Sequence, residues 1–284
     1  MTTTLLIDAD ILAYRTASAN EKRYDWGEGV TSHIVNDDFE AIKKDIQSEL
    51  DDLLLRTEAD DFLICLSDDN YNWRKKVLPS YKQHRKNSIR PELLYPLKDY
   101  LFENYPSYRK ETLEADDVMG ILSTHPKLIA GKKIIVSEDK DMKTIPGWLF
   151  NPKKDKKPRL ITPEAADRFH MYQTITGDTT DGYKGCPDVG DKGAIEMLDS
   201  PFLMVPYEYE FQRGKRKGTT EVRYEQAPAP SLWEGIVSLY EWKGLTEYDA
   251  ITQARVARIL RHTDYDFKTK EVIYWNPVKP QTTK

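Results

Sequence analysis

The sequence has few of the residues that build disulfide frameworks, membrane spans or zinc sites. It contains 2 cysteines, Cys65 in an apolar run and Cys186 in a glycine-rich loop, and we expect both to be reduced thiols. No apolar run approaches the roughly 20 residues of a transmembrane helix, and "MTTTLLIDAD" is not a secretory signal. The 5 histidines are scattered, which argues against zinc. These absences predict a soluble cytoplasmic protein with no membrane partner.

Acidic residues are in slight excess, which by itself argues against a polyanionic partner. The 284-residue chain has 42 Lys and Arg and 47 Asp and Glu, a net charge of −5. The charges are segregated, however: basic runs occupy residues 73–86, 153–159 and 213–217, and acidic residues gather in short clusters elsewhere. A basic run alone is more often a solvated loop than a binding surface, so these runs count only together with other signals.

Three short apolar runs each end in acidic residues, and their length and β-branched content are typical of buried strands. The acidic residues at these ends are Asp8 and Asp10, Asp68 and Asp69, and Glu138, Asp139 and Asp141. Helical patterns lie over about 38–56, 91–104 and 113–124. This alternation predicts an α/β fold with a central, mostly parallel sheet flanked by helices. Ligands bind such sheets at the carboxyl ends of the strands, where these acids fall.

The pattern changes near residue 163, so we expect one domain over 1–162 and a second region over 163–284. The second region begins with a helical pattern over 162–176, followed by a glycine-rich loop that enters another helix. Alternating segments on both sides of "RGKRKG" predict a β-hairpin with a basic tip. "APAP" at 227–230 indicates a linker, and 231–262 is predicted to be helical.

Residues 111–120, "ETLEADDVMG", crowd Glu114, Asp116 and Asp117 into four positions, and each charge makes it harder to ionise its neighbours. One interpretation is structural: Thr112 caps a helix whose positive end favours acids. The other is a divalent cation, because Glu114 and Asp117 share a helix face and oxygen ligands suit Mg²⁺ or Mn²⁺. Two such cations about 4 Å apart are suited to phosphodiester cleavage.

Five stretches occur in order along the chain: "LIDAD", "DDNYNWRKKVLPSYKQHRK", "LEADDVMG", "SEDKDMKTIP" and "GDTTDGYKG". Together they resemble the flap-endonuclease/5′-nuclease superfamily, most closely the 5′→3′ exonucleases of tailed bacteriophages. "ARVARILRHTDYDFKTKEVIYWNP" near the C-terminus is similar to the same phage branch. The resemblance covers nearly the whole chain and is weakest around 200–230. It implies a PIN-like catalytic domain over 1–162, with a helical arch at about 71–105, and a helix–turn–helix-type DNA-binding and helical region over 163–284.

The resemblance also implies two metal ions, Mg²⁺ with Mn²⁺ as a substitute. The ligands of one ion are Asp8, Asp68, Glu114 and Asp116, with Asp117 bridging or behind them, and those of the other are Asp139, Asp141, Asp178 and Asp181. Asp69 is an alternative to Asp68, because this loop is one residue longer than the family pattern. Asp10 is expected to lie behind the ligands.

For the substrate, the resemblance implies that Lys82 and Arg85 grip the scissile phosphate and that Tyr81 stacks on a terminal base. Such stacking tolerates any base. Further DNA contacts are expected from Arg74, Lys75, Gly185, Gly190 and Lys192. The glycine-rich turns let backbone amides approach duplex phosphates, and the family's loop implies a K⁺ ion. Asp188 stands where the family usually has Gly.

The function expected from these features is metal-dependent 5′→3′ exonuclease activity on double-stranded DNA and on RNA–DNA hybrids, releasing 5′-phosphorylated products in phage replication and recombination. The nearest alternatives are a flap endonuclease, which would take flap DNA as substrate, and a PIN-type ribonuclease. A haloacid-dehalogenase-type phosphatase also uses Asp-x-Asp after its first strand, but it needs neither the 114–117 cluster nor "YKQHR". The acidic clusters argue against a non-catalytic DNA-binding module, because without a metal they would repel DNA phosphate. A phage single-stranded-DNA-binding protein is an expected partner.

Overall fold

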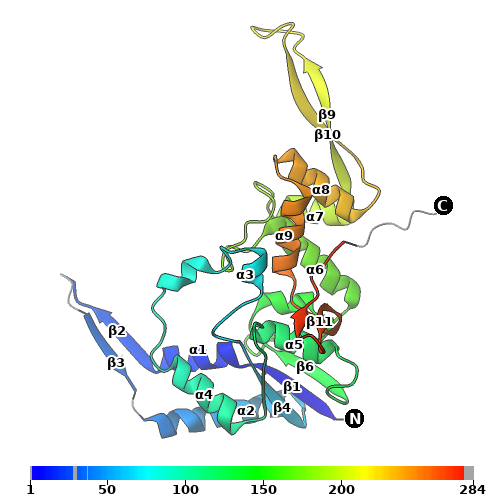
Figure 1. Ribbon diagram of the computed structural model, residues 1–284. Coiled ribbons are helices and arrows are strands. Elements are labelled where there is room, and N and C mark those ends of the chain that lie inside the picture. The colour runs from blue at the N-terminus through cyan, green and yellow to red at the C-terminus, as the bar shows by residue number, and fades with distance from the viewer. Residues whose placement is uncertain (1, 28–30, 37, 278–284) are drawn as a thin grey trace. The chain divides into compact units, whose positions relative to one another are not determined.

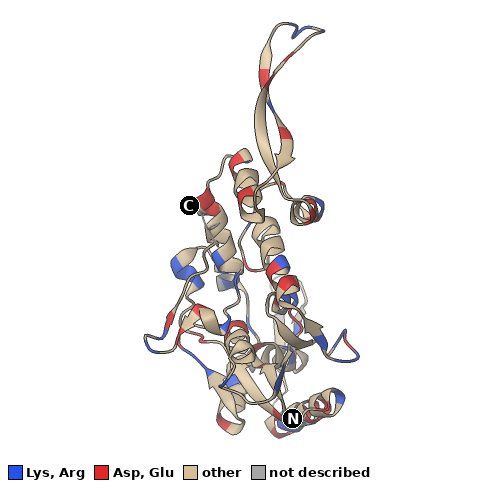
Figure 2. Ribbon diagram, turned by 90° about the vertical axis from the view of Figure 1, so that its right-hand side faces the viewer, with Lys and Arg blue, Asp and Glu red and all other residues tan. Residues whose placement is uncertain are grey.

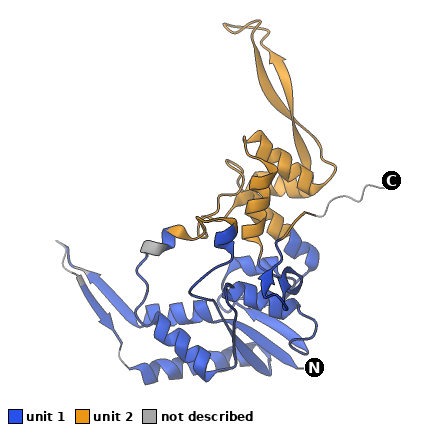
Figure 3. Ribbon diagram, viewed as in Figure 1, with its two compact units in different colours: residues 1–76, 84–167, 259–274 blue, residues 77–83, 168–258, 275–284 orange. Residues whose placement is uncertain are grey.

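The computed structural model describes residues 2–27, 31–36 and 38–277, and the chain falls into two units (Figure 3). The first unit contains residues 1–76, 84–167 and 259–274, and the second contains 77–83, 168–258 and 275–284. The units therefore do not follow the two continuous ranges expected from the sequence. Residues 77–83 group with the second unit, and 259–274 group with the first.

A six-stranded sheet in the order β5-β4-β1-β6-β7-β8 forms the centre of the first unit (Figure 1). All neighbours pair in parallel except β7 and β8, which confirms the predicted α/β fold with a mostly parallel sheet. The strands are β1 Thr3–Asp8, β4 Asp61–Leu66, β5 Ser107–Arg109, β6 Lys132–Val136, β7 Gly147–Phe150 and β8 Arg159–Ile161.

Helices cover both faces of this sheet. Leu5 and Ile7 of β1 pack in one core with the helices α1 (Ala9–Ala19), α2 (Phe39–Thr57) and α4 (Leu94–Asn104). Leu6 is equally buried but points to the opposite face, since side chains alternate along a strand. The helix α5 (Ala115–Thr124) contacts β1 and β4. The predicted helical patterns thus agree with α2, α4 and α5 to within three residues.

The expected arch region over about 71–105 contains three separate elements. These are the short helix α3 (Arg74–Val77), the 3-10 helix η1 (Gln83–Asn87) and α4. The remaining small elements of the first unit are the hairpin of β2 (Glu21–Asp25) and β3 (Thr31–Val35), η2 (Lys140–Thr144), η3 (His262–Asp264), β11 (Tyr265–Asp266) and β12 (Glu271–Val272).

The second unit is helical apart from one long hairpin (Figure 1). Its elements are α6 (Pro163–Thr176, which begins in the first unit), α7 (Asp191–Asp199), α8 (Leu232–Trp242), α9 (Glu247–Ala257), β9 (Phe202–Glu210) and β10 (Thr220–Pro228). The predicted hairpin is confirmed, but the predicted linker at 227–230 is wrong at its start, because Ala227 and Pro228 pair with β9. The single helical stretch expected over 231–262 is two helices, separated where Gly244 takes a φ of +76°. Within the described residues, no helix is both long and apolar enough for a membrane span.

Candidate active site

The sheet brings acidic residues from four parallel strands to one edge. Asp8 is the last residue of β1, Asp68 follows β4, Glu114 follows β5, and Asp139 follows β6. These strands are adjacent in the order β5-β4-β1-β6 and run in the same direction. The placement agrees with the expectation that ligands of such a sheet bind at its carboxyl edge.

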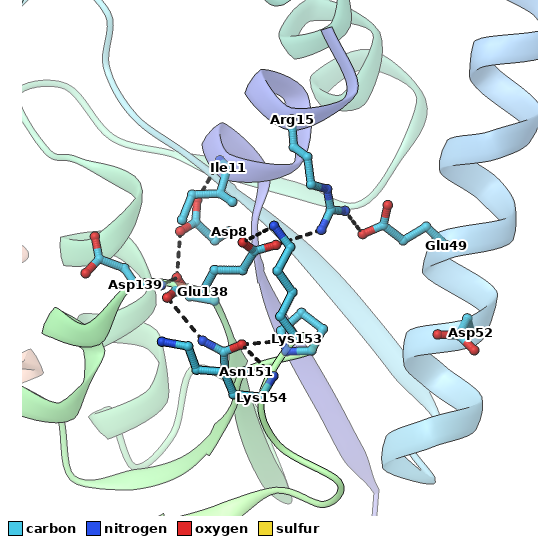
Figure 4. A network of polar contacts seen from close by, with 12 residues as sticks. Asp8, Ile11, Arg15, Glu49, Asp52, Glu138, Asp139, Asn151, Lys153 and Lys154 are labelled. Atoms are coloured by element: carbon cyan, nitrogen blue, oxygen red, sulfur yellow. Dashed lines mark hydrogen bonds and ion pairs between the residues drawn. The ribbon is translucent and has the colours of Figure 1, made fainter. Parts of the chain in front are cut away.

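Asp8 is a buried carboxylate oriented by neutral donors. Its side chain caps α1 by accepting from the Ile11 amide (3.1 Å), and it accepts from the Ser137 hydroxyl (2.8 Å) (Figure 4). Burial raises the pKa of Asp8 to about 7, and the nearby charges of Asp10 and Asp139 add to the rise. A bound cation would oppose both causes, because it stabilises the ionised form. Asp8 therefore fits the chemistry of a metal ligand.

Asp68 ties the loop after β4 to the start of α5. Its carboxylate accepts from the amides of Thr112 (2.8 Å) and Asn70 (3.0 Å), and its own amide donates to the Leu113 carbonyl (2.9 Å). Partial burial alone would raise the pKa of Asp68, but these hydrogen bonds and the charge of Arg109 lower it overall. Asp68 is therefore held ionised.

The "LEADD" stretch divides into residues with different environments. Asp117 is fully buried and accepts from both Arg74 nitrogens (2.7 and 2.8 Å), from Trp73 Nε1 (2.9 Å) and from the Leu260 amide (3.1 Å). Its oxygens are thus occupied by protein donors, which favours the alternative in which Asp117 lies behind the ligands, and its role stays a prediction. Glu114, rather than Thr112, caps α5 and forms a capping box with Asp117.

Arg74 is 2% exposed and pairs with Asp117 and also with Glu114 (3.0 Å). These contacts favour a structural role for Arg74 in this conformation, and its DNA-binding role stays a prediction. The next residue, Lys75, is exposed, and its DNA-binding role stays a prediction. Asp116 lies half-buried in the first turn of α5.

An unpredicted lysine lies among the acids. The ammonium of Lys98, on α4, pairs with Asp69 (2.6 Å) and Asp10 (2.9 Å), and its residue is 6% exposed. Burial would lower the pKa of Lys98, but the two carboxylates outweigh burial and raise it. The sequence contained a signal for this residue, since Lys98 interrupts the apolar stripe of Leu94, Leu97 and Leu101.

A second group of cations neutralises the acid that follows β6. Glu138 pairs with Arg15 (2.7 Å) and with Lys153 (2.7 Å), and Arg15 also pairs with Glu49 on α2 (Figure 4). The basic run at 153–159 therefore contributes at least one cation to this network. Asp139 caps η2 by accepting from the Asp141 amide (2.8 Å). Ser137, which sequence reasoning missed, donates to Asp8 and accepts from the Asp139 amide (3.1 Å).

In the second unit, Asp178 and Asp181 lie in one tight loop. Asp178 is buried and accepts from the amides of Thr180 (2.7 Å) and Asp181 (3.3 Å). Asp181 accepts from the Tyr81 hydroxyl (2.7 Å), and its other oxygen is 3.4 Å from the Lys82 ammonium.

Tyr81 is 2% exposed and packs with Tyr183, Val256 and Ala257. The ring anchors residues 77–83 in the second unit, and in this conformation it is not accessible to a nucleotide base. Its stacking role stays a prediction. Lys82 is in this segment too and has a φ of +51°. Arg85 is half-buried in η1 and is grouped with the first unit.

The glycine-rich loop before α7 depends on left-handed backbone. Gly185 has a φ of +65°, and a Cβ there would lie 2.3 Å from the Gly177 nitrogen. Asp188 also takes a left-handed φ, +59°, a backbone conformation that favours Gly. Gly190 is the N-cap of α7, and Lys192 is exposed in its first turn.

The donor chemistry of the sheet edge fits a divalent cation, since carboxylate oxygens from separate strands converge there. Across the ranges that the structure describes, no three His, Cys, Asp or Glu side chains form a ready-made metal cluster. The individual ligand assignments accordingly stay predictions.

The sequence matches the family described as "5′-3′ exonuclease, N-terminal resolvase-like domain" over residues 3–148. The chain belongs to the 5′-3′ exonuclease family. It is 35% identical to the exonuclease of Escherichia phage T7 over 96% of this chain and 93% of that protein. It is 34% identical to the exodeoxyribonuclease of Enterobacteria phage T3, over 96% and 92% of the two chains.

Among solved structures, the T5 D15 protein co-crystallized with metal ions is similar in fold. It has a TM-score of 0.57 and 14% identity, covering 90% of this chain and 89% of that one. The expected family, fold class and function, a 5′→3′ exonuclease of the phage type, are confirmed at this level. These relatives give the phosphatase alternative no support.

We predict that Lys98→Met lowers the free energy of unfolding by about 1–3 kcal/mol, because it leaves Asp10 and Asp69 without their shared cation. The carboxylates are about one-third exposed, which keeps the loss below that of a fully buried pair. Urea unfolding at neutral pH in a chelating buffer measures the change.

The pKa of Lys98 is raised, so this stabilisation is complete at neutral pH and is lost only as pH rises through the raised pKa. Adding Asp69→Asn to Lys98→Met should recover part of the loss. An unchanged unfolding midpoint in Lys98→Met would show that the ion pairs contribute nothing.

Proposed function

We propose that this protein is a divalent-metal-dependent nuclease that degrades double-stranded DNA from 5′ ends and releases 5′-phosphorylated products. The observation that carries the proposal is the buried, like-charged carboxylate Asp8 at the edge of a sheet where three other strands also deliver acids. A bound cation would offset the repulsion between these carboxylates and keep Asp8 ionised. We infer Mg²⁺ as the natural ion, with Mn²⁺ as a substitute, because all the donors are oxygen atoms.

The partners of each acid guide the choice of ligands. Asp8 and Asp68 accept hydrogen bonds from neutral amides and a hydroxyl, so these contacts place no protein cation on their oxygens. Asp69 instead pairs with Lys98. We therefore choose Asp68 over Asp69 as a ligand, together with Asp8. Glu114, which pairs with Arg74, and Asp116 are included because the family resemblance implies them. Asp139, Asp141, Asp178 and Asp181 complete the proposed set.

Divalent ions bound by these residues would activate a water molecule and stabilise the leaving oxygen of the phosphodiester. Lys82 and Arg85 would meet the phosphate as charge builds in the transition state. Lys82 is held by Asp181 in this conformation, so its ammonium and a cation would compete for that carboxylate.

Further substrates and partners follow from the same family membership. We propose that RNA–DNA hybrids are cleaved as well as duplex DNA, and that the loop containing Gly185, Gly190 and Lys192 contacts duplex phosphate through backbone amides, with K⁺ bound at its turn. A single-stranded-DNA-binding protein is the proposed replication partner, and the cytoplasm of the host is the proposed location. Flap DNA is the alternative substrate.

A product ladder from end-labelled DNA tests the function. With 5′-labelled duplex and Mg²⁺, labelled mononucleotides should appear first, whereas 3′-labelled duplex should shorten gradually. Chelation with EDTA should stop both. Release of the label from the 3′ end first would contradict the proposed direction, and cleavage only at flap junctions would favour the alternative.

Asp139→Ala should reduce this activity by several orders of magnitude while the protein stays folded, because it removes a proposed ligand from a like-charged group. Asp45→Asn on the exposed side of α2 is the matched control and should be as active as the wild type. Equal activity of the two variants would remove Asp139 from the metal site.

Lys82→Ala and Arg85→Ala should each slow single-turnover cleavage by roughly 10²–10³, as expected for losing one donor to a developing oxyanion. DNA affinity should fall only a few-fold, since other phosphates supply most of it. Lys82→Ala should also lower the Mg²⁺ concentration at half-maximal rate, because Asp181 loses a competing cation.

The matched control is Lys75→Ala, a neighbouring exposed lysine whose loss should weaken binding without slowing the single-turnover rate. Arg85→Lys should restore activity in part, since it keeps the charge but not the planar fork. If the alanine variants cleave at the normal rate and only bind more weakly, Lys82 and Arg85 belong to the general basic surface.

A further inference from the structure

The hairpin of β9 and β10 is the longest projection of the second unit (Figure 1). Its strands pair over 9 residues each, from Phe202 opposite Pro228 to Glu210 opposite Thr220. At about 3.4 Å per residue, the ladder carries its tip roughly 30 Å from the root.

The root is fixed to the helices of the same unit. The Met204 amide donates to the Ser238 hydroxyl on α8 (2.8 Å), and Gln226 donates to Glu196 on α7 (3.2 Å). A groove of about 740 Å³ is lined both by the root and by the start of α7, including Gly190 and Lys192. The root of the hairpin therefore lies beside the loop proposed to contact duplex phosphate, and the tip projects away from that loop.

Aromatic rings and guanidinium groups stiffen the stem. Tyr207 and Tyr209 of β9 share one face, and Phe211 follows two residues later, just beyond the end of the strand. Arg223 lies over the Tyr209 ring at 3.5 Å, and Arg216 lies over Phe211 at 3.9 Å. A two-stranded ribbon is only marginally stable by itself, and these contacts hold its end in place.

Charge is divided sharply along the hairpin. Four exposed cations occupy the tip, Arg213, Lys215, Arg216 and Lys217, and Arg216 pairs with Glu221 at 2.6 Å. The stem carries the acids Glu208, Glu210, Glu221 and Glu225, and its cation Arg223 pairs with Glu221 at 2.7 Å. Figure 2 shows this division, with blue at the end of the hairpin and red along its stem.

The composition of the tip selects the kind of partner. Residues 212–218, "QRGKRKG", contain no apolar side chain, whereas protein interfaces depend on buried aromatic or aliphatic anchors. Arg and Lys in a glycine-flanked loop fit a phosphate backbone. The acidic stem would be repelled by DNA, so the ribbon cannot lie along a groove and must contact the backbone with its end.

We propose that the tip of this hairpin, residues 213–217, binds the phosphate backbone of the duplex about 30 Å from the loop before α7, which corresponds to roughly nine base pairs. This inference rests on the proposed function, in which duplex DNA is the substrate. The tip is a second duplex-binding site, and it holds the part of the substrate that has not yet been degraded.

The first test is the salt dependence of binding to a duplex of about 30 base pairs, measured by fluorescence anisotropy in EDTA so that no cleavage occurs. Two variants are compared with the wild type: the neutral tip R213Q/K215Q/R216Q/K217Q, and the charge-preserving tip R213K/K215R/R216K/K217R. The neutral tip should reduce the slope of log K against log salt by about 3, and the charge-preserving tip should leave it unchanged.

The second test is geometric and uses duplexes of increasing length. Wild-type affinity should rise once the duplex is long enough to reach the tip, and the neutral tip should show no such rise. Deleting 207–210 together with 220–223 removes four paired positions and moves the tip inward by about 14 Å. The rise should then occur in duplexes about four base pairs shorter.

An unchanged salt slope in the neutral-tip variant, or a rise at the same duplex length in the shortened hairpin, would overturn the proposal. An unchanged salt slope would favour an acidic protein, in place of DNA, as the partner of the tip. Cleavage of duplexes of about eight base pairs by the wild-type protein tests the nuclease function separately, because such duplexes are too short to reach the tip.

Discussion

The structure of the first unit depends on how it compensates the negative charge at the carboxyl edge of its sheet. Four adjacent parallel strands deliver acids to this edge, and carboxylates in such positions repel one another and lose hydration. Internal cations neutralise some of them: Arg74 serves Asp117 and Glu114, Lys98 serves Asp10 and Asp69, and Arg15 and Lys153 serve Glu138.

Other acids at the same edge are held by neutral groups. Asp8 and Asp68 accept hydrogen bonds from amides and a hydroxyl, which fix their orientation without cancelling their charge. A protein that only needed to be stable would gain from pairing them as well. The division into cation-paired and amide-held acids is what we expect of a site that binds a divalent ion between rigid oxygen donors.

Much of this arrangement could be predicted from local sequence pattern. The strands that end at Asp8, before Asp68 and before Asp139 follow from short apolar runs, and the parallel sheet then places the acids together. The roles of neighbouring residues could not be predicted in the same way. Arg74 and Lys75 are adjacent in one basic run, yet the first is buried against Asp117 and the second is exposed.

The reason is that long-range partners decide such roles. Asp117 receives hydrogen bonds from Trp73 and from the Leu260 amide, which lie 44 and 143 residues away in sequence. Tyr81 was expected to meet a nucleotide base, but the packing of α9 against residues 77–83 buries it. Lys98 differs, because its position within the apolar stripe of α4 could have predicted from sequence alone that it is buried and paired with an acid.

The central claim is that, at the end of β4, the amide-held Asp68 binds the metal and the cation-paired Asp69 does not. Asp68 and Asp69 are adjacent and differ in this property, so they provide the most direct comparison. Binding of Mn²⁺ to the protein without DNA can be followed by electron paramagnetic resonance of the free ion. Asp68→Asn should weaken Mn²⁺ binding at least about tenfold, while Asp69→Asn should change it less than about twofold. Equal loss in both variants, or loss only in Asp69→Asn, would contradict the account.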